Sequence, residues 1–100
     1  MHQPYYHFFW PAALNYGKLG MLIGHELNHA FDDHGVQWNS DGQLQQWMTN
    51  TSMGSFKASA NCLINEYNGF CPLDNRTYRP NCVDGVQTQG ENLADNGGIR

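Results

Sequence analysis

The chain contains 100 residues, of which five are basic and nine acidic, so that its formal net charge is −4 at pH 7. Such a chain is long enough for one small domain, and its acidic balance excludes the basic surface with which proteins bind nucleic acids. No apolar run reaches the length of about eighteen residues that a membrane helix needs, and the N-terminus lacks the charged and apolar regions of a signal peptide.

The first eleven residues, MHQPYYHFFWP, are rich in aromatic side chains. Pro4 and Pro11 exclude a regular helix across this stretch, because proline lacks the backbone N–H and clashes with the preceding turn. We expect an extended segment that packs on a core and that can include a short strand. His2 and His7 have no ligand partner at a fixed spacing, which favours packing and surface roles for both.

A turn at Asn15-Tyr16-Gly17 is expected to lead into a helix over residues 18–34. On that helix His25 and His29 lie four residues apart, so their imidazoles share one face and can reach the same metal ion. With Glu26 beside them they form the pattern HExxH, which is typical of two zinc ligands and the general base of a metallohydrolase. The alternative is a pair of core histidines with an unrelated glutamate between them.

Turn signals follow this helix. Gly35 is expected to be its C-cap. His34 is expected at the helix end, where a positive charge is favoured by the helix dipole, rather than on a metal. The run Asn39-Ser40-Asp41-Gly42 then predicts a tight turn.

A second helix is predicted over residues 51–67, because apolar residues recur there at steps of three and four. They make one stripe, which consists of Met53, Phe56, Ala60, Leu63, Ile64 and Tyr67. A stripe of methionine, aromatic and aliphatic residues at this spacing is typical of core packing, so no cofactor is needed to explain it.

A third helix is predicted from about residue 90 to residue 100, and it carries Glu91 and Asp95. A catalytic zinc ion takes three protein ligands and leaves the fourth position to water, and Glu91 is the natural third ligand beside His25 and His29. Asp95 lies four residues further on the same face, where it can accept the free N–H of a zinc-bound imidazole and hold its tautomer.

In this order of motifs the sequence resembles the neprilysin and endothelin-converting-enzyme family of zinc metalloendopeptidases. The matching stretches are ALNYGKLGMLIGHELNHAFDDHG, DGQLQQW and GENLADNGGI, and the resemblance runs over nearly the whole chain. It implies a mainly α, thermolysin-like (gluzincin) zinc site with one Zn²⁺ ion, and hydrolysis of oligopeptides on the amino side of hydrophobic residues. Only 14% of the residues are charged, which fits an incomplete segment, residues 1–100, of a larger catalytic domain and ectodomain.

Cysteines and glycosylation sequons point to the secretory route. Cys71 and Cys82 bracket a loop that they could close, and in the family a cysteine matching Cys62 pairs with one near the extreme C-terminus. We therefore predict a disulfide between Cys71 and Cys82 and no partner for Cys62 within this chain; the alternatives are three reduced thiols or a cysteine metal site, which the lack of CxxC disfavours. The sequons at Asn50 and Asn75 and the resemblance favour an extracellular or cell-surface protein.

Two other functions compete with the peptidase. The first is a catalytically inactive homologue, or an isolated fragment, that binds zinc without turnover. The second is a helical interaction domain with a chance HExxH, which requires Glu91 to lie far from both histidines. Nothing in the sequence indicates an oligomeric state.

Overall fold

The computed structural model describes residues 5–72 and 82–100. In chain order the elements are helix α1 (Ala12–Asn28), the 3₁₀ turns η1 (His29–Phe31) and η2 (Gly35–Gln37), helix α2 (Asn50–Tyr67) and helix α3 (Gln89–Gly98). The described residues contain no named strand, only an isolated antiparallel bridge between Trp38 and Leu44. The prediction of a mainly α fold is confirmed.

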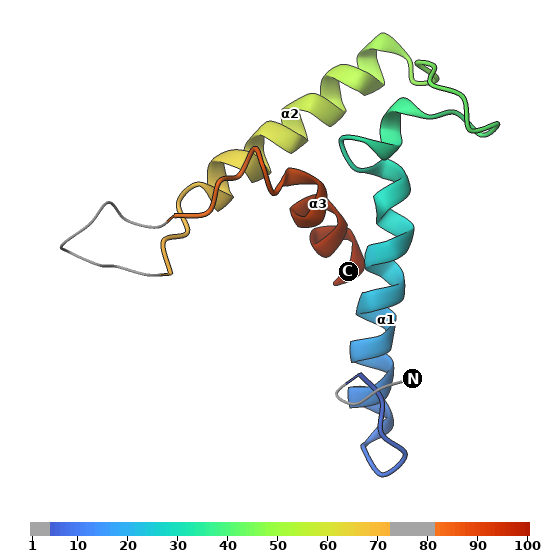
Figure 1. Cartoon of the computed structure of the whole chain (residues 1–100), viewed down its shortest axis with the longest axis vertical. Coiled ribbons are helices and arrows are strands. Elements are labelled where there is room, and N and C mark those ends of the chain that lie inside the picture. Colours follow the sequence, from blue (N-terminus) through green and yellow to red (C-terminus); the bar gives the residue numbers. More distant parts are fainter. Residues whose placement is uncertain (1–4, 73–81) are drawn as a thin grey trace.

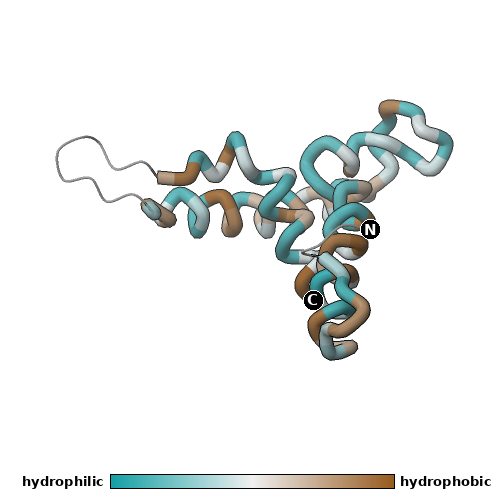
Figure 2. Tube along the Cα trace, turned by 60° about the horizontal axis from the view of Figure 1, so that its bottom comes forward, coloured by the Kyte–Doolittle hydropathy of each residue, from teal (hydrophilic) through white to brown (hydrophobic). Residues whose placement is uncertain are grey.

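Helices α1 and α2 form two arms, and α3 lies in the angle between them and packs mainly on α1 (Figure 1). The molecule is flat, 48 × 46 × 19 Å, and its radius of gyration of 17.0 Å exceeds the roughly 13 Å of a compact domain of this length. In the described part, Val36, Ala60 and Ala94 are the only buried hydrophobic side chains. Figure 2 shows apolar stretches along both arms rather than around one centre. The helices therefore enclose little core of their own.

The prediction for the residues before α1 is wrong where the structure describes them. Instead of extended chain packed on a core, residues 5–10 contain a turn in which the Trp10 N–H donates to the His7 carbonyl at 3.0 Å. Phe8 and Phe9 are 79% and 84% exposed. Turn formation removes the extended backbone that a strand would need.

Helix α1 begins at Ala12, not at residue 18. Pro11 directly precedes it, a place where proline is tolerated because the first helical N–H groups have no partner within the helix. Asn15, expected in a turn, lies inside the helix, and its side chain donates to the His7 carbonyl at 2.8 Å and accepts from the His7 N–H at 3.0 Å. The Asn15 side chain therefore stabilises the preceding turn and does not interrupt the helix.

The same helix ends at Asn28, earlier than the predicted residue 34. The chain tightens into η1 and then leaves the helix because the Asp32 carboxylate accepts the N–H groups of His34, at 2.9 Å, and Gly35, at 2.7 Å. Gly35 is not a left-handed C-cap, since Gly42, in the predicted turn, is the one glycine with positive φ among the described residues. Gly35 is instead required by space, because a Cβ there would overlap the carbonyl oxygen of His29.

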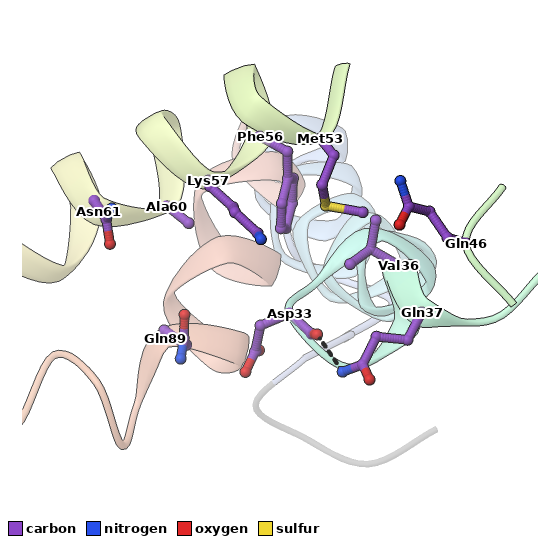
Figure 3. A pocket seen from close by; sticks show the side chains of 10 residues that line it. All are labelled: Asp33, Val36, Gln37, Gln46, Met53, Phe56, Lys57, Ala60, Asn61 and Gln89. Carbon is purple, nitrogen blue, oxygen red and sulfur yellow. Dashed lines mark hydrogen bonds between the residues drawn. The ribbon is translucent and has the colours of Figure 1, made fainter. Parts of the chain in front are cut away.

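Helix α2 agrees with its prediction to within one residue. Its N-cap is Thr49, whose hydroxyl accepts the Ser52 N–H at 3.1 Å. All six stripe residues are buried or half-buried, and every other position of the helix is exposed. In Figure 3 Met53 and Phe56 face Val36 across a cavity of about 440 Å³ that α2 shares with η2 and the start of α3.

A disulfide joins Cys71 to Cys82, as predicted, and Cys62 is an exposed free cysteine on α2. Asn50, the first sequon asparagine, is exposed at the start of α2, whereas Asn75 and His2 lie outside the described residues. No helix in the described ranges is long and apolar enough to cross a membrane.

Candidate metal centre

The contact between α1 and α3 brings the three predicted ligands together. His25 lies in the last turn of α1, His29 begins η1, and Glu91 lies in the first turn of α3. The Nε2 atoms of His25 and His29 are 2.9 Å apart. Glu91 Oε2 lies 3.2 Å from His25 Nε2, and its Oε1 lies 3.6 Å from His29 Nε2.

These separations suit a tetrahedral ion. Bonds of 2.0–2.2 Å to zinc imply distances of about 3.3–3.6 Å between neighbouring ligand atoms. The separation of 3.6 Å lies in that range, and those of 3.2 and 2.9 Å lie slightly below it. The competing hypothesis of a helical interaction domain with a chance HExxH requires Glu91 to lie far from both histidines, and this requirement is not met.

Each imidazole is held by a carboxylate on its other nitrogen. Asp95 Oδ1 lies 2.8 Å from His25 Nδ1, so the imidazole beside Asp95, which the sequence analysis did not specify, is that of His25. Asp32 Oδ2 lies 2.8 Å from His29 Nδ1, a contact that the sequence analysis missed. The signal for Asp32 was its place three residues after His29, which puts the two side chains on one face of a helical turn.

The carboxylates determine the tautomer of each ring. An ionised carboxylate only accepts hydrogen bonds, so His25 and His29 donate from Nδ1 and, when neutral, carry lone pairs on Nε2. Two lone pairs that face each other at 2.9 Å, with the Glu91 carboxylate beside them, repel unless a cation lies among them. The donor set therefore fits a divalent metal such as zinc.

The pair formed by His29 and Asp32 is electrostatically tuned. The hydrogen bond that His29 donates to Asp32 is the main cause that raises the pKa of His29. Desolvation opposes the rise, and the charges of Glu91, Asp32 and Glu26 add to it. Burial is the largest single effect on Asp32 and opposes its ionisation. Hydrogen bonds from Gly35, His29 and His34 together outweigh burial and lower the pKa of Asp32.

Glu26, the predicted general base, is exposed on α1 and is not among the three grouped ligands. It borders a shallow hollow of about 390 Å³ whose other lining residues are Leu19, Leu22, Ile23 and Leu27. A carboxylate at this open edge remains accessible to a water molecule or a substrate.

Other candidates in the described part are weaker. Asp32, Asp33 and His34 also bring ligand atoms near one another, but both oxygens of Asp32 already accept hydrogen bonds. His7 accepts the Phe9 N–H at its Nδ1, 3.2 Å away, within a local turn. The cavity of Figure 3 is lined by none of the three proposed ligands.

Comparisons with known proteins agree with this geometry. Residues 1–100 match the sequence model of peptidase family M13. The chain is 41% identical over 97 residues to endothelin-converting enzyme 1 of Rattus norvegicus, and this match covers 97% of this chain and 12% of that protein. It is 42% identical over 100 residues to neprilysin-1 of Caenorhabditis elegans, a match that covers 100% of this chain and 13% of that protein. The structure of Mycobacterium tuberculosis zinc metalloprotease Zmp1 in complex with an inhibitor matches with a TM-score of 0.88 and 38% identity, over 97% of this chain and 15% of that one.

Proposed function

Because this chain belongs to peptidase family M13, we propose that it carries the zinc centre of a metalloendopeptidase. His25, His29 and Glu91 hold one zinc ion in this proposal. It depends on one observation above all, the convergence of two imidazole Nε2 atoms and the Glu91 carboxylate within 2.9–3.6 Å.

The proposed chemistry assigns one task to each side chain. When bound, the ion would supply Lewis acidity, which lowers the pKa of a bound water molecule toward neutrality and polarises a carbonyl group. Glu26 accepts the proton of the attacking water as its oxygen bonds to the scissile carbonyl carbon. Glu26 then delivers that proton to the amide nitrogen as the C–N bond breaks. Asp95 and Asp32 keep the Nδ1 protons of His25 and His29 in place throughout.

We further propose that the substrates are oligopeptides cleaved on the amino side of hydrophobic residues, as the family resemblance implies. The chain would then act within a larger catalytic domain and ectodomain, which accords with its 12–13% share of the relatives' length. A disulfide between Cys71 and Cys82 and an exposed Asn50 support an extracellular or cell-surface location, because disulfides persist in oxidising compartments.

Paired measurements of zinc content and peptide hydrolysis on the full-length protein test these roles. Glu26→Gln should keep its zinc and lose about 10²–10⁴-fold in turnover, because it removes a base but no ligand. Glu91→Gln and His25→Ala should lose zinc affinity as well as rate. Glu66→Gln, at an exposed position of α2, is the matched control and should change neither. Loss of zinc in Glu26→Gln together with full zinc and activity in Glu91→Gln would contradict the assignment.

Zinc binding without turnover is the second candidate function. The open surroundings of Glu26 and the scarcity of buried apolar residues favour it for these 100 residues in isolation. In the full-length protein, stoichiometric zinc that depends on His25 and Glu91 with no hydrolysis of any peptide in a mixed library would identify this case.

A further inference from the structure

We propose that Gly24 and Gly98 are positioning residues that set the spacing between α1 and α3 and thereby place Glu91 and Asp95 against His25. This inference rests on the proposed zinc centre, since its consequence is measured there. It adds a role for two residues that have no side chain and touch no metal.

The two helices touch at these glycines with almost no space to spare. A Cβ on Gly24 would lie 2.9 Å from the Cα of Gly98 and 3.0 Å from its carbonyl oxygen. A Cβ on Gly98 would lie 2.6 Å from the His25 nitrogen, 2.7 Å from the Met21 oxygen and 3.0 Å from the His25 Cα. All these neighbours are backbone atoms, which cannot rotate away as a side chain can. A methyl group at either position must therefore move one helix relative to the other.

The helical repeat connects this contact to the metal centre. Gly98 follows Asp95 by three residues and Glu91 by seven, so all three lie on the face of α3 that meets α1. On α1, Gly24 directly precedes His25. The two carboxylates of α3 and the imidazole of His25 therefore lie at the helix contact where Gly24 and Gly98 allow the close approach.

The displacement can be estimated. Carbon atoms in ordinary contact lie about 3.5–4.0 Å apart, so a methyl at Gly24 would force a local separation of about 0.6–1.1 Å. The hydrogen bond between His25 Nδ1 and Asp95 Oδ1 now measures 2.8 Å. The same displacement would lengthen it to about 3.4–3.9 Å, beyond the usual N–H···O range of about 2.7–3.2 Å. Zinc would then lose both a well-placed Glu91 and the support of Asp95.

Gly97 provides an internal comparison. A Cβ there would overlap the carboxamide of Asn28, whose Nδ2 donates to the Gly24 carbonyl at 2.8 Å. Because the obstacle is the end of a side chain, Asn28 can rotate and release the overlap. We therefore expect Gly97→Ala to affect zinc binding less than Gly98→Ala.

The test measures zinc dissociation constants by chelator competition on the full-length protein. Gly24→Ala and Gly98→Ala should weaken zinc binding by about 10–100-fold, as the loss of a hydrogen bond that supports a ligand does. Gly20→Ala is the matched control on α1, because a Cβ there meets nothing within 4 Å, and its affinity should stay within about twofold. If Gly98→Ala fails to fold, Gly24→Ala, with its longer contacts, carries the test.

A double-mutant cycle separates positioning from a general loss of stability. If Gly24→Ala acts by pulling Asp95 from His25, then Asp95→Asn should add little to its effect on zinc affinity. The Co²⁺-substituted protein should also show a changed d–d absorption spectrum in Gly24→Ala but not in Gly20→Ala. Zinc affinities of Gly24→Ala and Gly98→Ala equal to the Gly20→Ala control would overturn the positioning role and leave the proposed function intact. Effects of Gly24→Ala and Asp95→Asn that simply add would overturn the part of that role that acts through Asp95. Absence of zinc from the unsubstituted protein would overturn both.

Discussion

Replacement of Asp32 by asparagine should reverse the tautomer of His29 without disturbing the turn that Asp32 stabilises. Asp32 Oδ1 accepts the N–H groups of His34 and Gly35, while Oδ2 accepts from His29 Nδ1. An asparagine has one acceptor oxygen, and the two backbone donors would retain it. Its NH₂ group would then face His29 Nδ1 as a donor. The ring would have to accept at Nδ1 and carry its proton on Nε2, the nitrogen that the metal needs.

The size of the effect follows from what zinc binding must undo. To present a lone pair at Nε2, His29 has to give up the new hydrogen bond and place two donors against each other in a half-buried site. A buried hydrogen-bonding group left without a partner costs about 1–3 kcal/mol. Since 1.4 kcal/mol corresponds to about tenfold in a dissociation constant, this cost of about 1–3 kcal/mol should lower zinc affinity by about 5- to 150-fold.

Chelator competition on Asp32→Asn, with Asp33→Asn as control, measures this loss. The Asp33 carboxylate lies 3.3 Å from His34 Nδ1 and, among the described residues, makes no hydrogen bond or ion pair with a proposed ligand, so the control should bind zinc normally. Nitrogen-15 NMR of the zinc-free protein should find the His29 proton on Nε2 in Asp32→Asn and on Nδ1 in the control. Unchanged zinc affinity in Asp32→Asn, or an equal loss in both variants, would refute the reasoning.

Three further predictions concern stability. In the zinc-free protein the pair of His29 and Asp32 should contribute most to the free energy of unfolding between pH 3.8 and 6.5. The stability that comes from the raised pKa of His29 is lost as the pH rises through that pKa. The stability that comes from the lowered pKa of Asp32 is lost as the pH falls through that pKa. Thermal unfolding of wild type and Asp32→Asn across pH checks this, and a constant difference would contradict it. Replacing Cys71 and Cys82 together by serine should lower the free energy of unfolding by about 3 kcal/mol in urea denaturation, because the unfolded chain regains the entropy of the open loop, and zinc affinity should be unchanged. A loss of zinc would show that the disulfide also organises the centre. Gly35→Ala should destabilise by about 1–3 kcal/mol in the same denaturation assay, because its Cβ would overlap the His29 carbonyl, whereas equal stability would mean that the turn can open.

The parts of the fold that repeat along a helix could be predicted from the sequence. The stripe of α2 depends only on spacing, and each of its six positions is indeed buried or half-buried. The shared helical face of Glu91 and Asp95 likewise follows from their spacing of four residues, whereas the choice of His25 as the partner of Asp95 depends on how α3 packs on α1.

The parts that failed depend on side chains that bond to the backbone. Asn15 looked like a turn residue, but its amide bonds to His7 eight positions earlier and leaves the helix unbroken. Asp32 accepts the N–H groups of His34 and Gly35, so the chain does not continue as a helix, and its other oxygen accepts from His29 Nδ1. Periodicity carries no information on such choices, because both outcomes satisfy the same apolar pattern.

The hydrogen bond between His25 and Asp95 joins residues that are 70 positions apart. Closing a flexible loop of that length costs roughly 4 kcal/mol of chain entropy before any contact is gained. Because His25 and His29 precede α3 in the sequence, they are synthesised long before their carboxylate partners on that helix. During that interval Asp32 is the one of the three carboxylates that can already bond to an imidazole. The docking of α3, which is made after α1 and α2, completes the centre, so the rate of this non-local step should limit how soon a newly made molecule acquires its metal site.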